Sequence, residues 1–168
     1  MTAPIFDSIQ TQLGSLATAC AVSHGTLVVE ITPSSLSAVV HTLKSACQFD
    51  MLLDVTAIDW PSRQPRFDVV WHFYSTKHRV RVRVKTQVPE SEPVVESLTR
   101  HYGSAAFMER ECHEMYGIRF NGNADLRPLL LYEGFVGYPL RKDYPKLGEQ
   151  PLVPYREGFD IADRVGGH

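Results

Sequence analysis

Clustered cysteines and long apolar runs are the first things this sequence lacks. Only three cysteines occur in 168 residues, and Cys20, Cys47 and Cys112 lie too far apart for the close spacing of zinc or iron–sulfur ligands. An odd, scattered set also fits a disulfide scaffold poorly, which indicates a reducing compartment. No stretch approaches the roughly 20 apolar residues of a membrane span, and the first residues show no signal-peptide pattern. We therefore expect a soluble, intracellular protein.

An excess of charge of one sign is also missing. The 17 basic and 19 acidic side chains give a formal net charge of −2, whereas a nucleic-acid-binding domain is usually strongly basic. Hydrophobic residues make up 43% of the chain and charged residues 21%, which are the proportions of a globular domain rather than of a disordered chain. We expect one domain with its own core, and no nucleic-acid partner.

Catalytic signatures are equally scarce. The sequence contains no glycine-rich phosphate loop and no nucleophile elbow. His113 and Glu114 begin a zinc-protease motif, but the second histidine that this motif requires is replaced by Gly117. Glu109 and Glu111 lie about 200° apart around a helix, so they cannot jointly hold one substrate atom. We predict no catalytic, metal-binding or cofactor-binding residue; a free-standing metal enzyme centred on His113 and Glu114 is the weaker alternative.

Hydrophobic periodicity divides the first part of the chain into helices and strands. Apolar residues at helical spacing predict helices over residues 5–16, 36–47, 94–102 and 105–116. Apolar or alternating runs predict strands over residues 19–22, 27–31, 51–60, 67–74 and 79–85. Short links between neighbouring strands indicate hairpins. The sequence therefore predicts an α+β body, residues 1–117, with a mostly antiparallel sheet flanked by helices.

The helix predicted over residues 105–116 carries a dense group of ionisable residues. Ser104 precedes it as a candidate N-cap, and Gly117 follows as a C′ residue. An apolar stripe predicts that one side of the helix packs into the core, with Cys112 as a small core residue. On this interpretation the carboxylates are charged borders of the stripe rather than catalytic groups.

Residues 79–85 alternate strictly between valines and the cations Arg79, Arg81, Arg83 and Lys85. A period of two predicts a strand with one buried and one basic face. The favoured interpretation is a solvated edge strand whose charges discourage aggregation. Phosphate and an acidic protein partner are the alternatives, with the acidic protein ranked next after the edge strand. Nucleic acid comes last, because no aromatic residues alternate with the cations.

From Ile118 to His168 prolines and aromatic residues replace any periodicity. We therefore predict a second region, residues 118–168, as a long extended C-terminal tail. Such a stretch is too apolar for a simple linker. Two alternatives carry equal weight: the tail lies extended on another protein and docks there, or it folds back over its own sheet. In an extended segment Leu140, Lys142 and Tyr144 would face one way, and Arg141 and Asp143 the other.

Several motifs in this order resemble one known family. They are Asp54-Val55-Thr56-Ala57-Ile58-Asp59, Glu109-Arg110-Glu111, Glu114-Met115-Tyr116-Gly117-Ile118, Asp125-Leu126-Arg127 and the series from Gly137 through Tyr138-Pro139-Leu140-Arg141-Lys142-Asp143-Tyr144 to Pro145. Together they resemble the C subunit of NADH-quinone oxidoreductase, the 30 kDa-subunit family of respiratory complex I. The likeness covers most of the chain from Met51 onward.

The resemblance implies a component of the peripheral arm of complex I that binds no cofactor itself. It implies that flavin and iron–sulfur clusters lie in partner subunits, and that the complex couples electron transfer from NADH to quinone to proton translocation. The implied partners are the quinone-side D subunit, with the B and I subunits nearby, at the cytoplasmic side of the bacterial inner membrane. Contact with the membrane is then only through the complex.

The resemblance also implies which residues face partner subunits. They lie on the helix over residues 105–116 and in the tail: Glu109, Arg110, Glu111, Glu114, Arg127, Tyr138, Leu140, Arg141, Lys142, Asp143, Tyr144 and Pro145. The equivalent subunit of a related membrane-bound hydrogenase is the main alternative within the same class of assembly.

Overall fold

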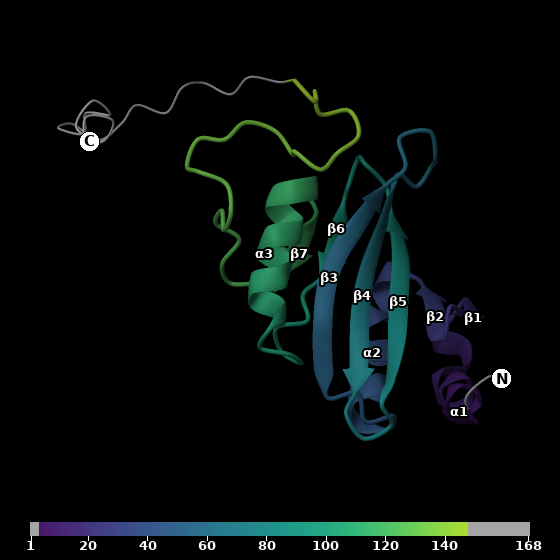
Figure 1. Cartoon of the computed structure of the whole chain (residues 1–168). Coiled ribbons are helices and arrows are strands. Elements are labelled where there is room, and N and C mark those ends of the chain that lie inside the picture. The colour runs from purple at the N-terminus through teal and green to yellow at the C-terminus, as the bar shows by residue number, and fades with distance from the viewer. Residues whose placement is uncertain (1–3, 148–168) are drawn as a thin grey trace, which may run out of the picture.

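The computed structural model describes residues 4–147, which form an α+β fold (Figure 1). The helices are α1 (Pro4–Leu13), α2 (Leu36–Ser45) and α3 (Ala105–Tyr116), with short 3-10 turns η1 (Gly14–Leu16) and η2 (Pro33–Ser35). The strands are β1 (Ala19–Ser23), β2 (Thr26–Ile31), β3 (Met51–Asp59), β4 (Phe67–Ser75), β5 (Val80–Val88), β6 (Val94–Glu96) and β7 (Arg119–Asn121). The predicted part of the tail at residues 148–168 lies outside the described residues.

Five strands form the main sheet in the order β1-β2-β5-β4-β3. Three of the four pairings are antiparallel, and β2 pairs in parallel with β5. Helix α2 lies on one face of this sheet, and α3 lies beside its edge strand β3 (Figure 1). The predicted α+β class with a mostly antiparallel sheet is confirmed.

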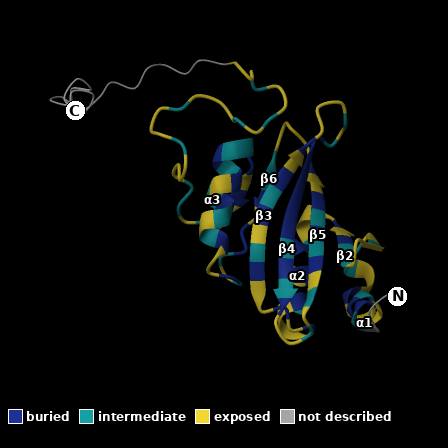
Figure 2. Ribbon diagram, in the orientation of Figure 1, coloured by how far each residue is buried: buried dark blue, intermediate teal, exposed yellow. Residues whose placement is uncertain are grey.

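The core lies between the sheet and the helices (Figure 2): β2 and β5 bury alternate side chains, whereas β4 is buried at every position from Phe67 to Trp71. Its largest fully buried side chains are Trp71, Phe49, Phe67, Phe73 and Phe120. Helix α2 contributes four apolar residues at helical spacing: Leu36, Val39, Val40 and Leu43. The apolar residues whose helical spacing predicted α2 are therefore the ones that it buries.

The helix predicted over residues 94–102 is wrong. Val94–Glu96 is strand β6, which pairs in parallel with β7, and residues 99–101 form a turn. The β-branched pair after Pro93 favours an extended backbone. Local periodicity missed this strand because its partner, β7, lies beyond α3 in the sequence.

The expectation that the basic strand is an edge strand is also wrong. β5 is the third of five strands and is paired on both sides, by β2 and by β4. The edges of the sheet are β1 and β3. Alternation along a strand fixes which side chains share a face, but it says nothing about the position of the strand in the sheet.

After β7 the chain enters a segment without helix or strand, residues 122–147, which we call the docked tail. It runs beside α3 and crosses over the C-terminal end of that helix (Figure 1). Residues 122–147 therefore fold back onto the body of their own chain. Ile118 and Phe120, which follow the predicted boundary at residue 117, are buried in the core.

Candidate functional site

The first anchor of the docked tail is the carboxylate of Glu114 on α3. Its two oxygens accept hydrogen bonds from the backbone N–H groups of Leu129 at 2.9 Å, Leu130 at 2.8 Å and Leu131 at 3.3 Å. These amides have no strand partner, and a carboxylate has enough lone pairs to satisfy all three. Glu114 therefore fixes the backbone of a turn that has no regular structure of its own.

Arg110 stands one helical turn before Glu114 and donates to backbone carbonyls of the tail, which a carboxylate cannot bond because it is itself an acceptor. Its guanidinium donates to the carbonyls of Arg127 and Pro128, each at 2.9 Å, and lies 3.5 Å from the carboxylate of Asp125. Residues four apart share a helix face. One face of α3 thus presents an acceptor and a donor to the same stretch of tail.

Glu109 is fully buried, which corrects the expectation that it forms a charged border of the helix. It accepts hydrogen bonds from the Ser97 hydroxyl at 2.7 Å, the Leu98 N–H at 2.7 Å and the Asn123 amide at 2.8 Å. Burial raises the pKa of its carboxyl group, and the three donors oppose that shift. Glu111, by contrast, is exposed.

Ser104 occupies the N-cap position of α3 but does not cap it, because its hydroxyl donates to the carbonyl of Leu52 on β3. Cys112 is buried, and that burial raises the pKa of its thiol, so it is the small core residue that the sequence predicts.

The second anchor is an ion-pair network where β3 ends and β4 begins; Arg66 and Asp59 are buried, whereas Glu90 and Asp143 are exposed. The guanidinium of Arg66 donates to both oxygens of Asp59, at 2.7 and 2.8 Å, and to the carboxylates of Glu90 at 2.6 Å and Asp143 at 3.0 Å. The hydrogen bond from Arg66 lowers the pKa of Asp59 and that of Asp143. Asp143 belongs to the docked tail, so this network ties the tail to the body.

Arg141 closes the same junction from the tail side. Its Nε donates to the carbonyl of Tyr116 at 2.7 Å, and its guanidinium lies 4.4 Å from the ring centre of Tyr138 and 5.0 Å from that of Phe67. The neighbouring N–H of Lys142 donates to Asp59 at 2.7 Å. Arg141 and Asp143 both contact the body, but residues 141–144 form a turn, with the Tyr144 N–H donating to the Arg141 carbonyl at 3.2 Å, and not the extended segment that the sequence predicts.

Gly117 makes this close approach of the tail possible. It ends α3 with a left-handed backbone, φ +78°, as the sequence predicts for a C′ residue. A Cβ at this position would lie 2.6 Å from both the Tyr138 ring and the Arg141 guanidinium. The residue is therefore needed without a side chain for two reasons: the conformation of the helix end and the space that the tail occupies.

The docked tail turns several large apolar side chains toward solvent. Leu130 is 63% exposed and Val136 68% exposed, and the same is true in lesser degree of Leu129, Tyr132, Tyr138 and Leu140. Three rings hold the tip together: Phe135 lies 5.5 Å from Tyr132 and 6.0 Å from Tyr144, between ring centres. Exposed apolar groups on a segment that is fixed by polar anchors mark a surface suited to protein contact.

A cavity of about 180 Å³ lies between α3 and the docked tail. His113 and Glu114 line it together with apolar tail residues, including Leu131, Phe135 and Tyr138. The Nδ1 of His113 bonds the carbonyl of Ile118 at 2.8 Å, and the carboxylate of Glu114 is engaged by backbone amides. Over residues 4–147 no group of three or more histidine, cysteine, aspartate or glutamate side chains could hold a metal ion.

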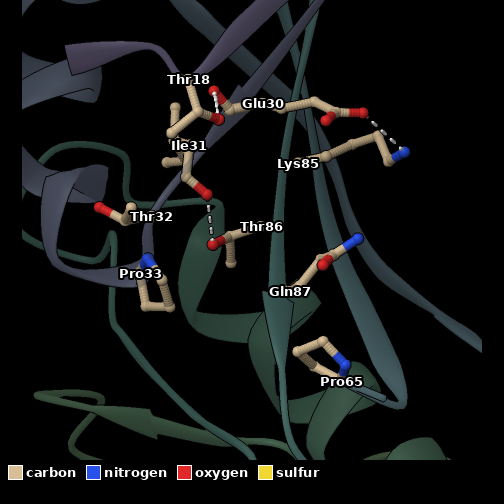
Figure 3. Close-up of a pocket in the computed structure, with 9 residues that line it drawn as sticks. All are labelled: Thr18, Glu30, Ile31, Thr32, Pro33, Pro65, Lys85, Thr86 and Gln87. Atoms are coloured by element: carbon tan, nitrogen blue, oxygen red, sulfur yellow. Dashed lines mark hydrogen bonds and ion pairs between the residues drawn. The ribbon is translucent and has the colours of Figure 1, made fainter. Parts of the chain in front are cut away.

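A second, open cavity of about 290 Å³ lies where β2 meets β5 (Figure 3). Thr86 donates to the carbonyl of Ile31 at 2.8 Å, Thr18 donates to the carbonyl of Glu30, and the Lys85 ammonium lies 3.6 Å from the Glu30 carboxylate. These polar groups are paired with one another, so they do not indicate a ligand for this cavity.

The structure thus divides the residues predicted to face partners into two sets. Glu109, Arg110, Glu114, Arg141 and Asp143 bond to the chain's own backbone or side chains. Arg127 also pairs with the carboxylate of Asp125 at 2.9 Å, and the remaining side chains are exposed or half-buried: Glu111, Tyr138, Leu140, Lys142, Tyr144 and Pro145. Asp59 and Arg66, which anchor the tail, were not predicted as site residues, and only the place of Asp59 in a recognised motif pointed to it.

The fold and its anchors define a class: a small α+β domain with a folded-back C-terminal segment held by buried ionic groups. Residues 29–150 match the family described as respiratory-chain NADH dehydrogenase, 30 Kd subunit. The chain belongs to this family, which confirms the resemblance seen in its motifs.

Individual relatives agree with this membership. The chain is 43% identical over 137 residues to the C subunit of NADH-quinone oxidoreductase from Agrobacterium fabrum, covering 80% of this chain and 68% of that one. It is 45% identical over 129 residues to the C subunit from Ruegeria pomeroyi, covering 76% of this chain and 64% of that one. The chain spans 60% to 68% of the length of such curated relatives.

Solved structures show the same fold. A trypsin-resistant fragment of Nqo5 superposes with a TM-score of 0.64 at 27% identity, covering 71% of this chain and 97% of the fragment. A chain of the membrane-bound sulfane sulfur reductase, an archaeal respiratory membrane complex, superposes with a TM-score of 0.75 at 22% identity, covering 93% of this chain and 97% of that one. None of the helices within residues 4–147 has the length and apolar character needed to cross a membrane.

Proposed function

We propose that this chain is the C-type subunit of an NADH-quinone oxidoreductase and serves its assembly rather than its chemistry. The observation that carries the proposal is the 43% identity to the Agrobacterium protein over 80% of this chain. The family match over residues 29–150 includes the whole docked tail. As part of the peripheral arm, the chain supports electron transfer from NADH to quinone coupled to proton translocation.

The engagement of its ionisable groups supports a non-catalytic role. His113, Glu114 and Glu109, the residues with the most suggestive sequence context, each bond groups of the chain's own backbone. The proposal assigns no cofactor to this chain and places flavin and iron–sulfur clusters in partner subunits.

The proposed partner surface is the outer side of the docked tail together with the exposed flank of α3. Its apolar residues are Leu130, Val136, Tyr138 and Leu140, and its charged rim includes Glu111, Arg127 and Lys142. An apolar centre with a polar rim is the usual composition of a stable interface. We assign it to the quinone-side D subunit, with the B and I subunits nearby, at the cytoplasmic side of the bacterial inner membrane. Glu109 and Glu114 contribute by holding the tail in place.

Co-purification from native membranes tests this proposal. The full chain is tagged, extracted in mild detergent and isolated by the tag. We expect it to bring down an assembly that contains flavin and iron–sulfur clusters and reduces quinone with NADH. Recovery of the chain alone from its native cell contradicts the proposal.

Removing residues 141–168 tests the part assigned to the tail. The body keeps its core, because the largest fully buried side chains all precede residue 122, so the truncated chain should fold and yet fail to assemble. Circular dichroism of the purified truncated chain controls for folding. Normal assembly of a folded, truncated chain contradicts the assigned role of the tail.

The equivalent subunit of a related membrane-bound complex is the second candidate, because the fold recurs in the archaeal sulfane sulfur reductase. The same co-purification separates the two. An assembly that contains iron–sulfur clusters but lacks an NADH-oxidising flavin subunit supports the second candidate and contradicts the first.

A further inference from the structure

Strand β5 carries a basic stripe on the sheet face opposite the buried core. Arg81, Arg83 and Lys85 alternate with the buried Val82 and Val84, so the three cations stand on one face. Charges that protect a free sheet edge belong on an edge strand. Because β5 lies between β2 and β4, edge protection does not explain the stripe.

Lys85 of the stripe is neutralised within the chain. Its ammonium lies 3.6 Å from the carboxylate of Glu30 (Figure 3) and 3.7 Å from that of Asp68. Within residues 4–147, Arg81 and Arg83 have neither an ion pair nor a hydrogen bond from their side chains. The Nε–H of Arg83 is shielded from solvent and has no hydrogen-bond partner in this part of the chain. Such a group has lost its water without gaining an acceptor, which is unfavourable.

The neighbouring strand adds no acid directly beside these two arginines. On β4, His72 lies opposite Arg83 and Tyr74 lies opposite Arg81. Asp54 lies one strand further, opposite His72. Burial and the nearby guanidinium of Arg83 lower the pKa of His72, so its ring is neutral at pH 7. On β2, Val28 lies opposite Arg83, so neither adjacent strand places an acid opposite Arg83, and the nearest acid in this row is Asp54, one strand beyond His72.

We propose that Arg81 and Arg83 bind an extended acidic segment of a partner protein that lies across this face. Side chains two residues apart on a strand stand about 7 Å apart, and carboxylates at alternate positions of an extended peptide repeat at the same distance. A guanidinium forms two parallel hydrogen bonds to one carboxylate. Because the Nε–H of Arg83 is shielded from solvent, the two bonds from this guanidinium to a carboxylate would come from its terminal N–H groups.

A protein segment fits this stripe better than a nucleic acid does. No aromatic residue occurs within β5, and β4 places a single phenolic ring, Tyr74, opposite the stripe, so the cations do not alternate with a series of stacking platforms. Two arginines two residues apart on one strand match a repeating row of carboxylates on an extended peptide. The proposal concerns a surface separate from the docked tail, so it stands or falls independently of the complex to which the chain belongs.

Binding of a defined peptide to the full chain tests the proposal. The probe is a fluorescein-labelled decapeptide of alternating glutamate and threonine, followed by fluorescence anisotropy at low salt. We expect saturable binding that weakens about tenfold or more in the double variant R81E/R83E. The matched control is R100E/R119E, which changes the net charge equally at two exposed positions away from β5 and should leave the affinity unchanged.

The proposal is overturned if the wild-type chain does not bind the probe, or if both double variants weaken binding equally. It is also overturned if a decapeptide of alternating glutamine and threonine binds equally well. The same holds if a single-stranded oligonucleotide or inorganic phosphate displaces the probe at lower concentrations than unlabelled peptide does. Circular dichroism controls for folding. If R81E/R83E does not fold, the milder R83Q replaces it, and an unchanged affinity in R83Q also overturns the proposal.

Discussion

The body and the docked tail are ordered by different physical means. The body buries large apolar side chains such as Trp71 and Phe73, and its strands satisfy one another's backbone groups. The docked tail has no helix or strand, and its backbone is bonded by charged side chains of the body, including Glu114 and Asp59. A segment fixed in this way keeps its own apolar side chains free to face outward. The following predictions test that difference, beginning with the largest effect.

Shortening a core side chain should cause the largest loss of stability. Phe73 is fully buried and contacts the ring of Tyr102 at 5.6 Å between centres. Phe73→Ala should lower the free energy of unfolding by about 3–5 kcal/mol, because it removes buried surface and leaves a cavity. Urea denaturation measures the change. The matched control is Phe107→Ala, at a position 60% exposed, for which a change within about 0.5 kcal/mol is expected.

Glu109 joins the two regions, so its loss should be felt in both. Glu109→Ala leaves the Leu98 N–H and the Ser97 hydroxyl without their buried acceptor and leaves the amide of Asn123, at the start of the docked tail, with only its 3.3 Å bond to the Ala106 carbonyl. We expect a loss of about 3 kcal/mol in unfolding free energy. Glu111→Ala on the exposed side of the same helix should cost less than about 0.5 kcal/mol. Equal effects of the two substitutions would show that burial of Glu109 is not what matters.

Acid should release the docked tail before it unfolds the body. The pKa of Asp59 and of Asp143 is lowered in the folded chain, chiefly by the hydrogen bond from Arg66. A carboxyl with a lowered folded-state pKa adds stability above its unfolded value of about 3.9, and that stability is lost as pH falls through the folded value. Below about pH 4 the amide of Lys142 should lose its protection against hydrogen exchange while amides of β4 keep theirs. Simultaneous loss at both places would contradict the distinction between tail and body.

The smallest global effect should come from Glu114. Glu114→Ala removes the acceptor of the amides of Leu129, Leu130 and Leu131; the first two residues are exposed and the third is half-buried, so water can hydrate the freed amides. We expect faster hydrogen exchange at these three amides, by roughly tenfold, with about 1 kcal/mol or less of change in global unfolding free energy. A global loss as large as that of Phe73→Ala would mean that the tail belongs to the cooperative core.

The sequence predicted most of the body because its signals are local. Period-two burial along β5 and the helical spacing of α2 and α3 follow from backbone geometry alone, and the end of α3 follows from the conformational freedom of Gly117. The errors share a cause. The strand nature of β6 depends on β7, and the interior position of β5 depends on its pairing with β2, so neither can be seen in a short window of residues.

The routing of the docked tail was beyond local signals for the same reason. Its anchors join residues far apart in the sequence, such as Asp59 with Lys142 and Arg66 with Asp143. Glu109 and Glu111 also look alike in the sequence, although one is fully buried and the other exposed. Only the three-dimensional arrangement shows which carboxylate has donors around it. The motif resemblance singled out residues of α3 and of the docked tail without saying what each side chain contacts.

Gly117 couples helix α3 to the docked tail, so neither can be exchanged without the other. The space left by its missing side chain holds Tyr138 and Arg141. An asparagine, which tolerates a left-handed backbone, would preserve the helix end but force the Tyr138 ring and the Arg141 guanidinium out of their places. A design that transfers α3 to another protein should therefore transfer the docked tail with it. The reason is that Gly117 serves both segments, although they are separate in the sequence.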